Sequence, residues 1–465
     1  MKTLEVDFRN SWETVKNKDT LVTIRLTNTT LTRIGGFNAR PYSYDLDIHE
    51  VPRSTQIKGL WRWWARVILN GVLWDKGYDA NYGILDESIS RFLGSTGMAS
   101  LFRLNVRIKI SDYFTLSMTP EELLEKFKEH QNRFRDSKPE RKVLNRVYLH
   151  SKKTSLKIPY RTLEKIPRIR LLSIKRRDEC PAKYFKRIYE EMVLYPKGAL
   201  NIEISLSKNL SGWEKYFDAA FSSLLLALIF GGIGALTTRG FGALKIENVE
   251  TKKRIEYIDL YGFRRYYNYK GRFEELLSNI ISYARRSFKK IDIITNKIDV
   301  KRFQIPLVPA LSLGSGVFKY SVDELGDIPR DNDIRVLQKI GEATLKARWK
   351  EYWKESGYKY DTWILGLPRG QKNTGYYYYS EKTRERKECR HISAIQFTPV
   401  LLGNKWYVLR YGFVTRDWRD CKALKGFELR HFGKHYIREG KPVRMDPLKA
   451  FKDAFEKTSE ILRRR

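Results

Sequence analysis

Short segments with alternating apolar and polar residues recur through the first half of the chain. The clearest runs from 101 to 110, where apolar residues take every second position from Leu104 to Ile110, the period of a strand with one buried face. Strands are expected at 21–26, 101–110, 200–206 and 243–249, and helices at about 57–73 and 213–230. Strand, helix and strand, repeated twice, is the order of a split βαβ, ferredoxin-like unit.

The second half of the chain has fewer clear periods. Helices are expected at about 274–288, 334–353 and 448–463, and strands at 392–401 and 405–414. The charged stretch 250–254 is the predicted boundary, which gives an N-terminal domain of 1–250 and a C-terminal domain of 251–465. A second unit of the same kind fits this order, although the pattern supports it less than the first.

A basic insertion, at about 119–193, interrupts the first unit. Between positions 133 and 187 the chain has 19 Lys and Arg against five Asp and Glu. This excess favours contact with RNA, and contact with a neighbouring protein subunit is the alternative.

Composition places a large positive charge on a folded protein. The 465 residues include 89 Lys and Arg against 54 Asp and Glu, a formal net charge of +35, while 42% of the residues are hydrophobic. A thermophilic surface carries both signs in rough balance. The imbalance therefore favours a nucleic-acid partner over a membrane surface or an acidic protein.

Other sequence features exclude several classes of protein. The three cysteines stand far apart, so the sequence predicts neither a zinc site nor a disulfide framework, and we expect no metal and no cofactor. The most apolar run, 217–230, is too short to cross a bilayer, and the N-terminus lacks the pattern of a signal peptide. We expect a cytoplasmic protein that does not bind membranes.

The helix predicted at 57–73 has two distinct faces. Its basic stripe consists of Lys58, Arg62 and Arg66. Ser54 or Thr55 is expected to cap the start of this helix, where free N–H groups favour a phosphate. A solvated polar face is the alternative, but such a face mixes signs, and no acid occurs between positions 53 and 70.

The same helix carries three tryptophans. Trp61 and Trp64 lie on the apolar stripe and are expected in the core rather than as platforms for bases. Trp63 lies at the edge of the stripe, and both roles stay open for it.

Residues 231–242 contain five glycines in twelve positions. Glycine has no Cβ, so its backbone can adopt positive φ and approach a phosphate or another backbone closely. Two interpretations follow: an approach to RNA, or a tight turn between the preceding helix and the following strand.

These segments resemble the RAMP superfamily of CRISPR proteins, and within it the subunits of type III-B (Cmr) RNA-guided effectors. The resemblance rests on the helix 57–68, on Arg-Phe-Leu-Gly-Ser at 91–95 and on the glycine segment, in family order. Three positions depart from the family pattern, since Lys58, Leu236 and Thr238 stand where arginine is usual. Arg239 is the remaining one of the arginines usual in the glycine segment. This loss favours backbone N–H groups over arginine side chains for any phosphate contact there.

The resemblance implies two tandem ferredoxin-like (RRM-like) domains, an α+β fold with helical and basic insertions. It further implies a non-catalytic antiviral subunit at the end of a ribonucleoprotein filament, near the 3′ end of the CRISPR RNA, where it helps to engage target RNA. The expected partners are CRISPR RNA, target RNA and neighbouring RAMP subunits. The candidate RNA-binding residues are Gly35, Gly36, Arg40, Arg53, Lys58, Arg62, Arg66, Arg239, Gly240, Phe241, Gly242, Tyr377, Arg384 and Arg386.

Tyr377 and a separate cluster of acids with a histidine each have more than one interpretation. Aromatic and basic residues are interleaved from Tyr376 to His391, so Tyr377 stacks on a base or alternate tyrosines face a core. The competing enzyme hypothesis uses Asp45, Asp47 and His49, beside Glu50, for metal-assisted ribonuclease chemistry. A solvated loop is the favoured interpretation of that cluster.

Overall fold

The computed structural model describes residues 19–35, 42–43, 48–111, 166–167, 194–255, 258–260, 262–291, 298–345, 362–366, 375–387, 393–416, 427–432, 440–443 and 446–464. Its α-helices are α2 (Ser54–Asp75), α3 (Tyr82–Leu93), α8 (Phe217–Phe230), α9 (Lys270–Lys289), α10 (Asp333–Ala343) and α13 (Pro447–Arg463). Three 3-10 helices are η2 (Trp213–Tyr216), η3 (Phe263–Tyr267) and η5 (Thr362–Leu365).

The strands form several small antiparallel sheets, so the chain is an α+β protein. The longer strands are β1 (Thr20–Asn28), β5 (Phe102–Ile110), β6 (Leu200–Lys208), β7 (Leu244–Thr251), β9 (Phe318–Glu324), β10 (Gly375–Tyr379), β12 (Ile395–Leu402), β13 (Lys405–Phe413) and β14 (Glu428–Phe432). Two-residue strands are β2 (Tyr42–Ser43), β3 (Ile48–His49), β4 (Tyr78–Asp79), β8 (Asp299–Val300), β11 (Arg386–Lys387) and β15 (Lys441–Pro442).

The first sheet has four strands in the order β5-β6-β1-β7, and all neighbours are antiparallel. β1 and β5 belong to one strand-helix-strand repeat, with β6 between them, and β6 and β7 belong to the other, with β1 between them. This interleaving is the split βαβ arrangement that the sequence predicts for the first half.

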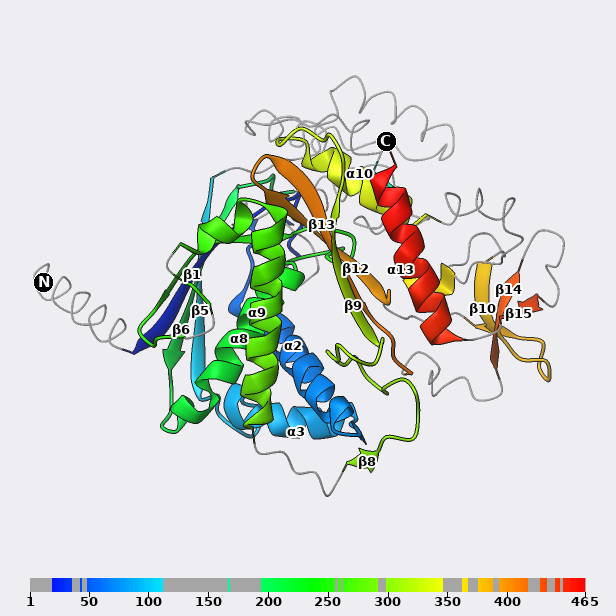
Figure 1. Ribbon diagram of the computed structural model, residues 1–465, viewed down its shortest axis with the longest axis horizontal. Coiled ribbons are helices and arrows are strands. Elements are labelled where there is room, and N and C mark those ends of the chain that lie inside the picture. The colour runs from blue at the N-terminus through cyan, green and yellow to red at the C-terminus, as the bar shows by residue number, and fades with distance from the viewer. Residues whose placement is uncertain are drawn as a thin grey trace, which may run out of the picture.

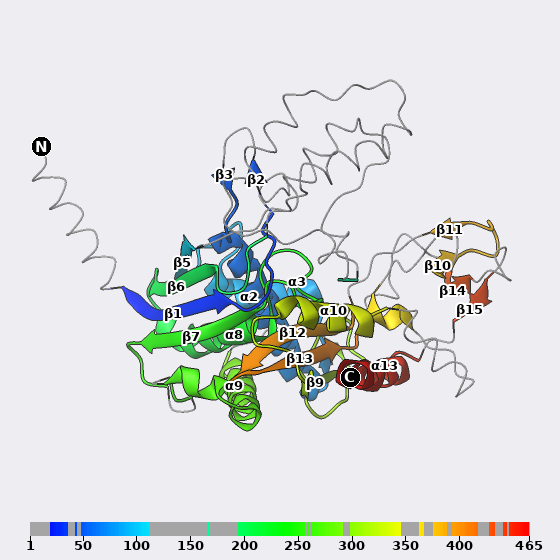
Figure 2. The same ribbon diagram turned by 90° about the horizontal axis from the view of Figure 1, so that it is seen from above.

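The helices α2 and α8 pack on one face of this sheet, and α9 packs on both of them on the same side (Figures 1 and 2). Alternation along β1 sets the two faces, because Ile24 is buried while Arg25 is exposed on the opposite side. No described helix covers that opposite face in either view.

A second sheet lies on the far side of the same helices, with the order β12-β13-β9. Trp64 of α2 and Phe230 of α8 pack against Tyr411 of β13, with ring centroids 5.8 and 5.1 Å apart. On its outer face this sheet is covered by α13, which also packs against α10. The described body therefore consists of sheet, helices, sheet and helices in successive layers.

Several predicted elements differ from the structure. The first helix begins at Ser54, earlier than expected, and α3 was not predicted. The helix predicted at 213–230 is divided into η2 and α8. Most of the basic insertion lies outside the described residues. Although α9 follows the predicted boundary at 250, it packs on α2 and α8, and the division into two domains stays a prediction.

Candidate RNA interface

The first turn of α2 is ordered by the backbone and by Gln56. Arg53 is the N-cap, and Gln56 accepts a hydrogen bond from its N–H at 3.3 Å and donates to the carbonyl of Gly35 at 3.4 Å. The predicted side-chain cap is wrong: Ser54 and Thr55 are the first helical residues and no side-chain cap bond is made. The N-cap position requires extended backbone, and Arg53 is the residue that adopts it. Ser54 and Thr55 therefore fall inside the helix.

Arg53 has a direct acidic partner just before the helix. Its guanidinium lies 2.7 Å from the carboxylate of Glu50, and the Glu50 carbonyl accepts a hydrogen bond from the Tyr195 hydroxyl at 2.6 Å. Arg53 nevertheless keeps 44% of its side chain exposed. The start of α2 therefore presents an accessible cation beside unbonded helical N–H groups.

Two residues of the predicted basic stripe are engaged inside the protein. Asp86 of α3 lies 3.3 Å from Arg62 and 2.7 Å from Arg66, and Arg62 also donates to the carbonyl of Gly94. No acid lies within 53–70, as the sequence shows, but a carboxylate reaches these arginines from another helix, which the local sequence of α2 does not reveal.

Lys58 is the member of the stripe that differs. Among the described residues it makes no ion pair and no hydrogen bond, and its side chain is half-buried. Burial, followed by the charge of Arg62, lowers the pKa of Lys58 below its ordinary value. An anion beside Lys58 would favour its charged form and so counteract this shift.

The tryptophans of α2 belong to the core. Trp61 and Trp64 are fully buried, as predicted, and the Trp61 indole donates to the Ala220 carbonyl at 2.9 Å. Trp63, whose role was open, packs edge-on against Trp64 and Phe413 at 5.2 and 5.7 Å. Trp63 and Trp64 therefore join α2 to the second sheet and Trp61 joins it to α8, so packing within the protein accounts for all three rings.

The glycine segment is a tight junction between α8 and β7. Gly234 and Gly242 have positive φ, and a Cβ on Gly242 would lie 1.9 Å from the Ile233 carbonyl oxygen. The N–H of Gly242 donates to Leu31 at 3.0 Å, and that of Gly240 donates to Thr237 at 3.1 Å. Because these N–H groups are already bonded, the geometry favours the turning role over a phosphate cradle.

The remaining candidates of this segment face the protein. Phe241 is 2% exposed, and a Cβ on Gly240 would meet Ile340 and Pro399 at 2.8 and 2.9 Å. Arg239 donates to the Leu365 carbonyl at 2.8 Å, and its backbone bridges to β12. This segment therefore links the first sheet to the second half of the chain.

The aromatic and basic segment of the second half forms a small sheet with the order β11-β10-β14-β15. Tyr376 and Tyr378 belong to the core, as one alternative predicts, whereas Tyr377 is half-buried and packs edge-on against Phe432 at 5.7 Å. Arg386 lies over the Phe432 ring at 4.1 Å. Arg384, at positive φ, is exposed, so it is the accessible candidate in this segment.

Sequence reasoning missed a group of cations on the open face of the first sheet. Arg103, Arg107 and Lys109 lie on β5 and Arg25 lies on β1, all with exposed side chains. The signal was present in the sequence, since the residues between the alternating apolar positions of 101–110 are mainly basic. The sequence interpretation assigned RNA contacts to the helix and the insertion instead.

Some predicted residues fall outside the description. Gly36, Arg40, Asp45 and Asp47 lie outside the described residues, and of His49 only the backbone, in β3, is described. Within the described part of the chain no group of three or more His, Cys, Asp or Glu could hold a metal ion. None of the described helices is long and apolar enough to cross a membrane.

Comparison with known proteins adds a resemblance to a family over part of the chain and a shared fold. Residues 52–245 match the RAMP superfamily. CRISPR system CMR subunit Cmr1 of Saccharolobus solfataricus is 30% identical over 253 residues, which cover 46% of this chain and 52% of that protein. The match therefore spans about half the length of this curated relative.

Two solved structures share the fold. A chain in the cryo-EM structure of type III-B Cmr-beta bound to cognate target RNA and AMPPnP, in the presence of ssDNA, has a TM-score of 0.54 at 16% identity and covers 96% of this chain and 100% of its own. A chain in the complex bound to cognate target RNA alone has a TM-score of 0.51 at 17% identity, with the same coverage. Residues 52–245 therefore resemble the RAMP superfamily, and part of the chain is similar in sequence to the Cmr1 subunit of a CMR complex.

Proposed function

We propose that this chain is a non-catalytic, RNA-binding subunit of a type III-B CRISPR (Cmr) effector, which caps the complex near the 3′ end of the CRISPR RNA and helps to engage target RNA. The RAMP match over residues 52–245, which includes α2 and the glycine segment, carries the proposal. Two ferredoxin-like domains are part of it: the second sheet repeats three neighbouring positions of the first, with β9, β13 and β12 in the places of β1, β6 and β5.

Base pairing between guide and target supplies sequence specificity in such complexes, and the protein reads the backbone and shape of the RNA. Lys58 and Arg53 are the proposed phosphate contacts near the start of α2, because Arg53 is exposed at the N-cap and the half-buried Lys58 has no partner among the described residues. Arg62 and Arg66 reach RNA only by exchanging their shared carboxylate for a phosphate. The glycine segment acts by joining the two halves of the protein.

Binding of the full chain to fluorescein-labelled single-stranded RNA, measured by anisotropy at several salt concentrations, tests the proposal. Lys58→Ala is expected to weaken binding and to reduce the slope of log affinity against log salt by about 0.7, the value for one phosphate of a single strand. Lys405→Ala is the matched control, because Lys405 pairs with Glu324 on the second sheet. Equal affinity and slope for wild type and Lys58→Ala would contradict this assignment.

The ribonuclease alternative is separated by a direct assay. Labelled RNA incubated with the chain and a divalent metal is expected to stay intact. Cleavage that disappears in Asp45→Ala or Asp47→Ala would replace the non-catalytic proposal with an enzyme.

A further inference from the structure

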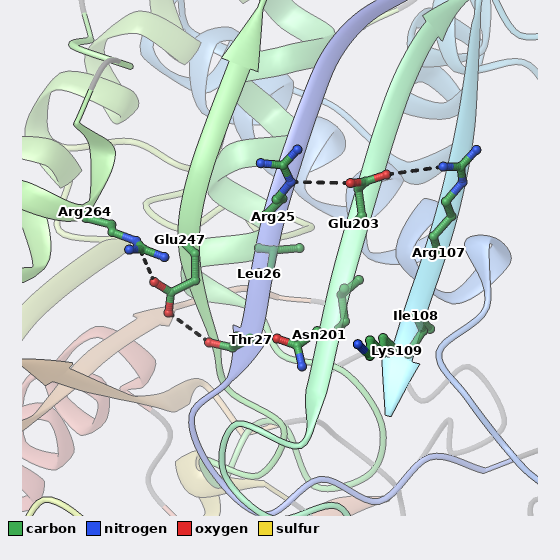
Figure 3. A pocket seen from close by; sticks show the side chains of 11 residues that line it. Arg25, Leu26, Thr27, Arg107, Ile108, Lys109, Asn201, Glu203, Glu247 and Arg264 are labelled. Carbon is green, nitrogen blue, oxygen red and sulfur yellow. Dashed lines mark hydrogen bonds and ion pairs between the residues drawn. The ribbon is translucent and has the colours of Figure 1, made fainter. Parts of the chain in front are cut away.

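A groove of about 660 Å³ crosses the open face of the first sheet. Its floor is formed by β5, β6 and β1, and Glu247 of β7 and Arg264 of η3 form one wall, as Figure 3 shows. The helices that cover this sheet all lie on its other side. We call this feature the sheet-face groove.

Basic side chains outnumber acidic ones in the sheet-face groove by four to two. The basic residues are Arg25, Arg107, Lys109 and Arg264, and the acidic residues are Glu203 and Glu247. Arg25, Arg107 and Arg264 are 53%, 60% and 73% exposed. These cations are open to a ligand, in contrast to those of α2 that face α3.

The acids in the groove hold the arginines only loosely. Glu203 lies between Arg25 and Arg107, at 3.4 and 3.9 Å, and the three side chains form a row across the strands (Figure 3). Ion pairs this exposed contribute little, because water and salt screen them. Arg25 also pairs with the exposed Glu250 at 3.0 Å, so a phosphate replaces Glu203 most readily at Arg107, and an arginine binds a phosphate in a bidentate manner.

One cation in the groove has no acid to exchange. Lys109 is exposed at the end of β5 and makes no ion pair or hydrogen bond with the described residues. It lies two positions from Arg107 on the same face of the strand, about 6.7 Å along it. The two cations form a short column at the edge of the sheet.

The uncharged residues indicate which anion fits. Thr27 and Asn201 line the groove beside the cations. The Thr27 hydroxyl donates to Glu247 at 3.1 Å, so it offers a ribose an acceptor, while the Asn201 amide offers both a donor and an acceptor. None of the described residues that line the groove is aromatic, so they give bases no stacking platform. A docked protein would need large apolar anchors, and none of these described residues is an exposed large apolar one, so a sugar–phosphate chain fits better than an acidic polypeptide.

We propose that the sheet-face groove binds the sugar–phosphate backbone of single-stranded RNA without reading its sequence. Lys109, Arg107 and Arg25 contact phosphates, Glu203 competes with them, and Arg264 closes the wall. This site is separate from the start of α2, and the proposal rests on the RNA-binding function proposed above.

Substitutions that remove either a positive or a negative charge from the groove test the proposal. The measurement is the anisotropy of fluorescein-labelled oligouridylate with the full chain. Lys109→Gln and Arg107→Gln are expected to weaken binding, and Glu203→Gln to strengthen it, each by about twofold to fivefold. Glu324→Gln is the matched control for Glu203→Gln, because it removes the same charge from an exposed pair on β9. Lys109→Gln removes no contact within the described residues, so its effect does not depend on altered folding.

The outcomes separate this proposal from the one on which it rests. If wild type binds RNA and Lys58→Ala weakens binding while the groove variants match wild type, the groove proposal is wrong and the function stands. If wild type does not bind RNA, the proposed function fails first. If Glu203→Gln and Glu324→Gln strengthen RNA binding equally, the effect comes from net charge alone and the groove proposal is wrong. Competition by a polyglutamate peptide as efficient as that by unlabelled RNA would overturn it as well.

Discussion

The two sheets of this protein face opposite ways from one shared layer of helices, and each has an arginine on a central strand that points outward. Arg25 of β1 lies on the open face and is 53% exposed between two glutamates. Arg410 of β13 lies beneath α13, where its side chain is 3% exposed and bonded to Asp323. One covering helix thus determines whether such a cation is open to a ligand or is part of the core.

The buried pair gives the largest expected effect. Arg410 also stacks on Phe455 at 3.9 Å and bonds to Thr458. Burial alone would raise the pKa of Asp323, but Arg410, Ser459 and Arg463 together hold it below its ordinary value. Arg410→Ala leaves this carboxylate without its main partner and is expected to lower the free energy of unfolding by about 3–5 kcal/mol, measured by urea denaturation.

Arg25→Ala is the control for that prediction. Its ion pairs lie in water, so the expected loss of unfolding free energy is below about 1 kcal/mol. Similar losses for the two variants would contradict the distinction between the open and the covered sheet.

A buried carboxylate without such a close partner sharpens the comparison. Asp333, at the start of α10, accepts a hydrogen bond from the Leu31 N–H at 3.0 Å, and burial raises its pKa to about 6. A pKa raised on folding means that the native state binds the proton more tightly, so this group adds stability as pH falls through 6 and loses it as pH rises. From pH 7 to pH 5 the gain is about 1 kcal/mol.

Asp333→Asn should abolish this contribution, since the amide does not titrate there and its oxygen still accepts from Leu31. Urea denaturation of both proteins at pH 5 and pH 7 measures it. A wild-type minus variant difference that is the same at both pH values would show that Asp333 does not titrate in this range.

A small effect on stability is also expected at Asp86, whose pairs with Arg62 and Arg66 are partly exposed. Asp86→Asn should lower the free energy of unfolding by about 0.5–1 kcal/mol and release two guanidinium groups. RNA affinity should then rise by about twofold to fivefold. Glu456→Gln, on the exposed side of α13, makes the same charge change as a control, and equal RNA affinity for the two variants would contradict the release.

The sequence contained the order and the faces of the first unit, but not the partners of its charges. Alternation from Leu104 to Ile110 predicted β5, and the spacing of apolar residues predicted the buried face of α2. Asp86 was missed because it meets the arginines through tertiary packing of α3 on α2, which periodicity along one helix cannot show.

The glycine segment shows a related limit of prediction from sequence. Its composition predicted close approach, and close approach is found, but to Ile233 and Arg33 of this chain. Glycine content shows that two groups come near each other without showing whether the second is protein or nucleic acid. Similarly, Trp63 at the edge of the apolar stripe could be placed only once β13 was seen to cover it.

The shared helical layer also determines the order in which the protein completes its core during synthesis. Trp64 and Phe230 leave the ribosome long before Tyr411 and Phe413, the strand residues that pack against them. Until β13 is made, the nascent chain presents an aromatic surface that only contacts distant in sequence can bury. Such long-range closure slows folding and favours aggregation of the waiting intermediate. Chaperone binding during synthesis should therefore be concentrated in the interval before β12 and β13 emerge.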